Sequence, residues 1–233
     1  MIYLFGTIAF LMPIFFIVRR QTVDDKQTLF LKCMSTFLIV YLSLVNYIEF
    51  HGDTTYFAIT ISGLIMCLIG DFLLGYCHVL GKPHKLYNKI RAAGMLIFML
   101  AHFFFIVNYA IHIENFVWYY IFIPIAVALT MFAFAPMAGF KWPHKALAVI
   151  SLFYMLTICI MLFFGLYYAI PVLQGTSPRN MVRGSLVIIA SVLFFSSDTM
   201  LGFMYFGGKK GTPISIANLT TYYLSLICLA LAF

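Results

Sequence analysis

The sequence predicts an all-α, polytopic membrane protein of about eight transmembrane helices, folded as a single integral membrane domain over residues 1–233. Three observations support this class. Hydrophobic residues make up 64% of the chain and charged residues only 9%, whereas soluble domains carry roughly 25% charged residues. The mean hydropathy is +1.03. The hydrophobic residues also form runs close to the length of about 20 residues that an α-helix needs to cross a bilayer.

Eight such runs follow one another, and each is predicted to be one membrane span: 2–18, 29–49, 56–77, 91–111, 116–135, 145–169, 183–206 and 213–233. The first run lacks the basic start and the small-residue cleavage site of a signal peptide, so it is interpreted as a span. Charged or turn-forming residues separate the runs, in order at Arg19 to Lys26, Glu49 to Asp53, Lys82 to Lys85, Glu114-Asn115, Lys141 to Pro143, Gly175 to Arg179 and Gly207 to Gly211.

The basic residues predict the orientation of the spans. Twelve of the fourteen lie in or beside the odd-numbered connections: Arg19, Arg20, Lys26, Lys32, Lys82, Lys85, Lys89, Arg91, Lys141, Lys145, Lys209 and Lys210. The even-numbered connections hold only Arg179 and Arg183. The positive-inside rule then predicts that the odd connections face the cytosol and that both termini are non-cytosolic. The expected location is the endoplasmic reticulum in a eukaryote, or the inner or plasma membrane in a bacterium.

One motif, Asp-x-x-Leu-Gly-aromatic, occurs twice inside predicted spans. It begins at Asp71 and again, 127 positions later, at Asp198. The two spans run in the same direction and carry the acid at a similar depth in their cytosolic halves. This correspondence favours a duplicated four-helix unit, a 4+4 parallel repeat about an axis along the membrane normal. An ionisable side chain at membrane depth costs at least about 2.5 kcal/mol, so both carboxylates are candidates for function.

Other polar residues within the spans have two interpretations each. Lys32 enters the second span from the cytosolic end, where it could extend its ammonium group to the interface or pair with a carboxylate or a substrate phosphate. His102 lies in the middle of the fourth span, either as a hydrogen-bonded structural residue or as a site residue. Asn46 and Asn108 are expected to join neighbouring helices.

Several chemistries lack their sequence signatures. The six histidines form no H-E-x-x-H motif, the five cysteines form no C-x-x-C pair, and no G-x-S-x-G motif occurs. We therefore expect no metal and no cofactor. The net charge of +7 is spread over single residues in short loops, so no nucleic-acid partner is expected. Hydrolysis in this chain would depend on the carboxylate pair, in which one acid keeps its proton and the other ionises.

Several short motifs occur in an order and spacing that resemble the YhhN family over essentially the whole chain. They are Leu68-Ile69-Gly70-Asp71, Gly94 followed by Ala101-His102, Phe195-Ser196-Ser197-Asp198, Thr221-Tyr222-Tyr223-Leu224, and Lys32 at the opening of the second span. The chain departs from the family pattern at Cys33, where proline is expected, and at Leu226, where glutamine is frequent.

The resemblance implies lysoplasmalogenase activity, the hydrolysis of the vinyl ether of a lysoplasmalogen to a fatty aldehyde and glycerophosphocholine or glycerophosphoethanolamine. It implies a lysophospholipid substrate drawn from the lipid bilayer, and it adds Lys32, His102 and Tyr222 as substrate-binding residues. Asp71 is assigned here as the general acid and Asp198 as the group that stabilises the cation, although the sequence alone does not fix which is which. The sequence does not indicate an oligomeric state.

Two alternatives use the same pair of acids. A proton-coupled transporter of a small molecule or lipid could use them as proton carriers. An intramembrane aspartyl protease also has paired aspartates on separate spans, but its motif is Gly-x-Gly-Asp. Here Leu68 replaces the first glycine, and no Pro-Ala-Leu segment is present.

Overall fold

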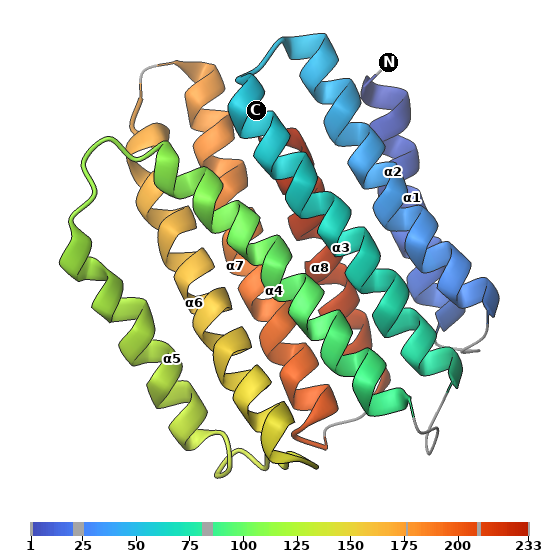
Figure 1. Ribbon diagram of the computed structural model, residues 1–233. Helices are drawn as coiled ribbons and strands as arrows, with labels where there is room; N and C mark the ends of the chain where they lie inside the picture. Colours follow the sequence, from blue (N-terminus) through green and yellow to red (C-terminus); the bar gives the residue numbers. More distant parts are fainter. Residues whose placement is uncertain (1, 21–25, 81–85, 176, 209–210, 233) are drawn as a thin grey trace.

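In the computed structural model, which describes residues 2–20, 26–80, 86–175, 177–208 and 211–232, every regular element is a helix. The α-helices are α1 (Ile2–Arg20), α2 (Lys26–Phe50), α3 (Thr54–Leu80), α4 (Tyr87–Ile111), α5 (Phe122–Phe134), α6 (Lys145–Leu173), α7 (Pro178–Tyr205) and α8 (Thr212–Leu231). A short 3₁₀ helix, η1 (Trp118–Ile121), leads directly into α5. The helices run alternately up and down in one bundle (Figure 1).

Seven of these helices, all except α5, are long and apolar enough to cross a membrane. The predicted fifth span is shorter than expected, because η1 and α5 together cover only Trp118–Phe134. Seventeen residues of ideal α-helix measure about 25 Å, which is less than the hydrocarbon thickness of about 30 Å. The chain is thus an all-α, polytopic membrane protein with eight α-helices among the described residues.

Six helices close a ring. The closely packed neighbours are α2 with α3, α3 with α4, α4 with α6, α6 with α7, α7 with α8, and α8 with α2. Helix α1 packs outside the ring against α2 and α8, and α5 packs against α6 at the opposite edge (Figure 1). If α2, α3 and α4 are exchanged with α6, α7 and α8, the ring maps onto itself. This pattern of neighbours agrees with the predicted 4+4 repeat.

Polar side chains join the helices of the ring, as Asn46 and Asn108 were expected to do. The Asn46 amide donates to the carbonyl of Ala230, 3.2 Å away on α8. The Asn108 amide donates to Thr60 Oγ1 at 2.8 Å and thereby joins α4 to α3. These hydrogen bonds between helices give the two amide N–H groups a partner in an apolar environment.

The loops divide between the two ends of the bundle. The first helix begins and the last helix ends at the same end, together with the connections after α2, α4 and α6 (Figure 1). Helices α1, α3, α5 and α7 end at the other end, called here the basic end because twelve of the fourteen basic residues of the sequence lie in or beside the segments that follow these helices. Four of the lysines used to predict the orientation fall outside the described residues, namely Lys82, Lys85, Lys209 and Lys210.

Candidate active site

Asp71 lies inside the ring, on α3, nine residues before the helix ends at Leu80. Only 1% of its surface is exposed. The Lys32 ammonium group lies 3.0 Å from Oδ1, while the hydroxyls of Thr36 and Tyr222 both donate to Oδ2, the latter at 2.8 Å. Lys32 and Thr36 share one face of α2 because they are one helical turn apart. An ammonium and two hydroxyl donors suit an ionised carboxylate.

Asp198 lies on α7, seven residues before the helix ends at Tyr205, and is also buried. Its Oδ2 accepts a hydrogen bond of 2.8 Å from the Tyr154 hydroxyl on α6. The His102 Nε2 atom on α4 is 3.1 Å from the same oxygen. This close approach lacks the alignment of a hydrogen bond, and His102 Nδ1 has no hydrogen-bond partner among the described residues. Asp198 therefore has a histidine beside it where Asp71 has a lysine.

The imidazole of His102 is enclosed by aromatic rings. The Phe194 ring lies 4.6 Å from it and the Tyr154 ring 5.7 Å from it, measured between ring centroids and both in edge-to-face geometry. His102 has no exposed surface. This packing fixes the imidazole ring beside the Asp198 carboxyl group.

Both acids line one polar pocket of about 50 Å³ inside the ring. Arg20, Lys32, His78, Asn218 and Tyr222 also line this pocket. We call it the polar pocket. The Asn218 side chain is held by Ser197, since its amide donates to the Ser197 carbonyl at 2.7 Å. The wall of the polar pocket beside Asp198 is therefore fixed by hydrogen bonds between α7 and α8.

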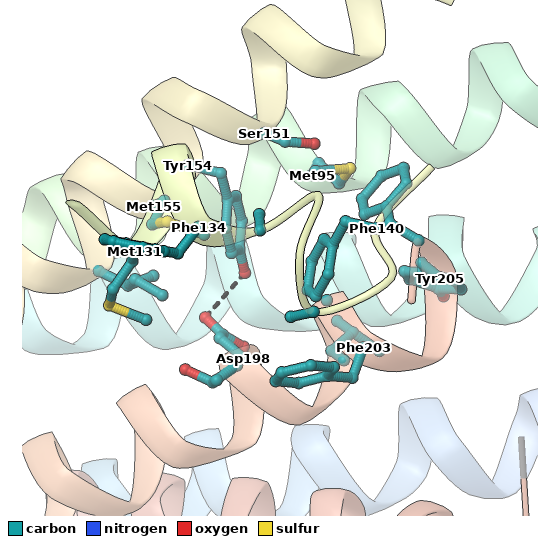
Figure 2. Close-up of a pocket in the computed structure, with 17 residues that line it drawn as sticks. Met95, Met131, Phe134, Phe140, Ser151, Tyr154, Met155, Asp198, Phe203 and Tyr205 are labelled. Atoms are coloured by element: carbon teal, nitrogen blue, oxygen red, sulfur yellow. Dashed lines mark hydrogen bonds between the residues drawn. The ribbon is translucent and has the colours of Figure 1, made fainter. Parts of the chain in front are cut away.

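Asp198 also lines a second pocket, of about 180 Å³, between α5, α6 and α7 (Figure 2). Its walls are mainly apolar and include Met131, Phe134, Met155 and Phe203. Figure 2 shows the hydrogen bond from Tyr154 to Asp198 at the edge of this apolar pocket. Asp198 is thus the carboxylate that borders both the polar pocket and the apolar pocket.

All five residues assigned from the sequence meet in this region, although their chemical roles remain predictions. Lys32 and Tyr222 contact Asp71, and His102 contacts Asp198. The ion pair of Lys32 with Asp71 agrees with its interpretation as a carboxylate partner. Sequence reasoning missed two hydroxyl donors. Thr36 donates a hydrogen bond to Asp71, and Tyr154 donates one to Asp198. Thr36 had a signal in its spacing of four residues from Lys32.

The far end of the bundle holds a different kind of acid. Asp53, just before α3, accepts a hydrogen bond of 3.0 Å from the backbone N–H of Tyr56 and so caps the helix. This hydrogen bond lowers the pKa of Asp53, as does the nearby His112 side chain. Asp53 is 43% exposed in its side chain, in contrast with Asp71 and Asp198. Its contacts account for it as a structural residue.

The described residues contain no group of three or more histidine, cysteine, aspartate or glutamate side chains able to hold a metal ion. A comparison with curated proteins and another with solved structures each found no match. A comparison with protein families matched residues 27–233 to the YhhN family. Because that match covers most of the chain, including both acids and all their hydrogen-bond partners, the chain belongs to the YhhN family.

Proposed function

We propose that the protein is a lysoplasmalogenase, an ether hydrolase that cleaves the vinyl ether bond of lysoplasmalogens inside the membrane. Membership of the YhhN family is consistent with this activity. The observation that carries the proposal is the pair of buried acids with different partners at the meeting of a polar and an apolar pocket. A lysolipid has the matching division, with a polar headgroup, an apolar tail and the reactive bond between them.

The contacts favour an exchange of the two roles assigned from the sequence. Asp71 is paired with a cation, so it suits the ionised role. Asp198 lies 3.1 Å from His102, a group able to exchange a proton with it, and lines the apolar pocket, where the alkenyl chain would lie. In this proposal Asp198 supplies the proton and Asp71 stabilises the developing cation and orients water.

The reaction begins when the protonated Asp198–His102 pair transfers its proton to the β-carbon of the vinyl ether, the carbon one bond beyond the carbon that carries oxygen. This converts the ether into an oxocarbenium ion, which the Asp71 carboxylate faces. Water adds to the carbon bonded to oxygen, and the proton that it releases returns to the Asp198–His102 pair. The resulting hemiacetal collapses as its hydroxyl proton moves to the glycerol oxygen. The products are a fatty aldehyde and a glycerophospho-base, and the site ends in its starting state.

The test is aldehyde release by protein purified in detergent. The substrates are a 1-alkenyl lysophospholipid and its 1-alkyl and 1-acyl analogues with the same tail and headgroup. We expect mass spectrometry to detect fatty aldehyde from the alkenyl lipid alone, because the alkyl ether has no double bond to protonate. Release of fatty acid from the acyl lipid, or no aldehyde at all, would contradict the proposal. A proton-coupled transporter would be silent in detergent and active only in sealed vesicles.

Substitution of the acids tests the assigned roles. Asp198→Asn removes the proton donor and should lower the rate of aldehyde release by roughly 10²–10⁴, the usual contribution of general acid catalysis. Asp71→Asn should be impaired less, because an amide still orients water. Glu114→Gln is the control, since Glu114 is exposed in the connection after α4 at the far end of the bundle. A greater loss in Asp71→Asn than in Asp198→Asn would restore the assignment made from the sequence.

A further inference from the structure

Arg20 is a basic residue of the polar pocket that neither the motifs nor the proposed chemistry uses. It is the last residue of α1, at the basic end, and its side chain lines the same pocket as Asp71 and Asp198. The pocket therefore has a cation on the side from which a lipid headgroup would enter. Helix α1 itself lies outside the ring of six helices, against α2 and α8.

Among the described residues that line the polar pocket, the charges do not balance without a further anion. Lys32 and Asp71 neutralise each other across 3.0 Å. Asp198 shares one proton with His102 in the proposed ground state, so that pair has no net charge. Arg20 then adds one positive charge to the lining of the pocket. A ligand with a single negative charge, such as a phosphodiester, would complete the balance.

The position of Arg20 along the axis of the bundle, relative to the two acids, also fits a site for the headgroup. His78 lines the polar pocket together with Arg20. Both His78 and Asp71 are on α3, seven residues apart, which is about 10 Å along the helix axis. Arg20 and His78 therefore lie toward the basic end of the pocket, beyond the acids. In a lysophospholipid the phosphate is separated from the vinyl ether by the glycerol backbone.

We propose that Arg20 binds the phosphate of the substrate headgroup and makes the enzyme selective for lipids that carry phosphate. This inference rests on the proposed function. The guanidinium group presents two parallel N–H donors that match two phosphate oxygens. His78 lines the same polar pocket as a second polar group. The phosphate held there would leave the glycerol beside Asp71 and the alkenyl chain beside Asp198.

The neighbouring residue Arg19 offers a matched control. It has the same charge and lies at the same end of α1, but its guanidinium group contacts Gln27 Oε1 at 3.2 Å on the exposed side of the helix. It does not line the polar pocket. A general attraction of anionic lipid to the basic end would depend on both arginines, whereas a phosphate site in the pocket depends on Arg20.

The experiment measures ligand binding by the full chain in a neutral detergent, from the shift of the unfolding temperature with ligand concentration. The ligands are 1-acyl lysophosphatidylcholine, the monoacylglycerol with the same tail, and glycerophosphocholine. The acyl lipid has no vinyl ether, so its binding does not depend on turnover. The variants are Arg20→Gln, Arg20→Lys and Arg19→Gln, each first compared with the wild type without ligand. If Arg20→Gln does not fold, Arg20→Lys still allows the test, because it keeps the positive charge but not the two parallel N–H donors.

The wild type should bind the lysophospholipid roughly ten- to a hundredfold more tightly than the monoacylglycerol, the range expected for a hydrogen bond between charged groups. Arg20→Gln should lose this preference, Arg20→Lys should keep part of it, and Arg19→Gln should keep all of it. In the aldehyde assay, Arg20→Gln should raise KM more than it lowers kcat.

Three results would overturn the inference: no preference in the wild type, a full preference in Arg20→Gln, or an equal loss in Arg19→Gln. Binding of glycerophosphocholine as tightly as the lysophospholipid would replace the lipid headgroup with a soluble phosphate compound as ligand. Phosphate-selective binding without aldehyde release would refute the proposed reaction and leave the phosphate site intact.

Discussion

Lys32 is charged and buried, and its position depends on Asp71. Its side chain is only 9% exposed, and its ammonium group is 3.0 Å from a carboxylate that is almost fully buried. Each charge alone would be costly to remove from water, and the contact offsets part of that cost. The Thr36 and Tyr222 hydroxyls satisfy the remaining oxygen of Asp71. The two acids therefore have different cationic partners. Asp71 faces the ammonium group of Lys32, whereas Asp198 faces His102, which is positively charged only when it is protonated.

Substitution of Lys32 separates a membrane-interface role from a site role. We predict that Lys32→Arg lowers kcat/KM several-fold, because the planar guanidinium group does not fit the position of the ammonium group beside Asp71. Lys32→Gln should lower it further and reduce stability by about 3–5 kcal/mol, since it leaves a buried carboxylate without its partner. The measurements are steady-state kinetics of aldehyde release and thermal unfolding in detergent.

The control for this prediction is Lys145→Gln, because Lys145 also lies near the start of a ring helix but is exposed. The double variant Lys32→Gln/Asp71→Asn should regain stability, though not activity, because it removes both charges together. Equal unfolding temperatures of the wild type and Lys32→Gln, with unchanged kinetics, would assign Lys32 to the membrane interface.

Sequence reasoning finds the ionisable residues of this site more readily than its hydroxyl groups. Asp71 and Asp198 stand out because carboxylates are rare in a chain with 9% charged residues. Tyr154 does not, since the chain has fifteen tyrosines and most of them suit an aromatic, membrane-buried interior equally well. Its role follows from the approach of α6 to α7, which brings its hydroxyl within 2.8 Å of Asp198. That approach is a tertiary property.

At the scale of the elements, hydropathy finds the helices and misplaces their ends. The predicted span 145–169 becomes Lys145–Leu173, and 56–77 becomes Thr54–Leu80. Helical hydrogen bonding continues through polar residues at the membrane interface, where hydropathy falls. Over 116–135 the apolar run continues, but the first part forms η1 and the last residue lies beyond α5. Where a turn interrupts an apolar run, the length of the run is therefore an upper limit to the length of the helix that it forms.

The close approach of α6 and α7 depends on Gly184. A Cβ atom at this position would lie 2.7 Å from the backbone nitrogen of Leu173 and 2.9 Å from the carbonyl of Ala169. Both contacts are with the backbone of α6, so the two helices would have to separate. The same pair of helices carries Tyr154 and Asp198. Small residues at such contacts allow membrane helices to pack closely.

We therefore expect Gly184→Ala to lower the unfolding temperature. The free energy of unfolding should fall by about 1–3 kcal/mol, as it does in other overpacked interiors. Aldehyde release should fall with it, because Tyr154 moves relative to Asp198. Gly6→Ala is the control: nothing lies within 4 Å of a Cβ there, and alanine favours the helix by up to about 1 kcal/mol. Wild-type thermal stability in Gly184→Ala would show that α6 and α7 tolerate a wider separation.

At the scale of the whole molecule, the ring of six helices gives the repeated motif its meaning. Exchanging α2, α3 and α4 with α6, α7 and α8 exchanges Asp71 with Asp198. Under the same exchange, helix α2, which carries Lys32 and Thr36, corresponds to helix α6, which carries Tyr154. Helix α8, which carries Tyr222, corresponds to helix α4, which carries His102. The sequence predicts this arrangement of backbones from two short motifs. The partners have diverged, so it does not predict which donors each acid receives.

The outer helices depart from this symmetry. Helix α1 packs against both α2 and α8, while its counterpart α5 is shorter and packs against α6. The short α5 borders the apolar pocket through Met131 and Phe134. Arg20 at the end of α1 lines the polar pocket instead. The unequal outer helices thus give the two acids different surroundings, one apolar and one basic.

The orientation of the molecule in the membrane is the last prediction. The positive-inside rule predicts that the basic end faces the cytosol. Lys141, between α5 and α6, lies at that end, and Glu114, after α4, lies at the other (Figure 1). Both residues are exposed. Single cysteines at these positions, in a background where Cys33 and Cys228 are replaced by serine, therefore report the two sides of the membrane.

In sealed vesicles that keep the cytosolic face inside, an impermeant maleimide should label Glu114→Cys at once and Lys141→Cys only after the vesicles are opened with detergent. The buried Cys67, Cys77 and Cys159 should stay unlabelled in both cases. The reverse pattern would invert the orientation and place the headgroup rim with Arg20 in the outer leaflet. Labelling of both cysteines from outside would mean that α5 does not carry the chain across the membrane.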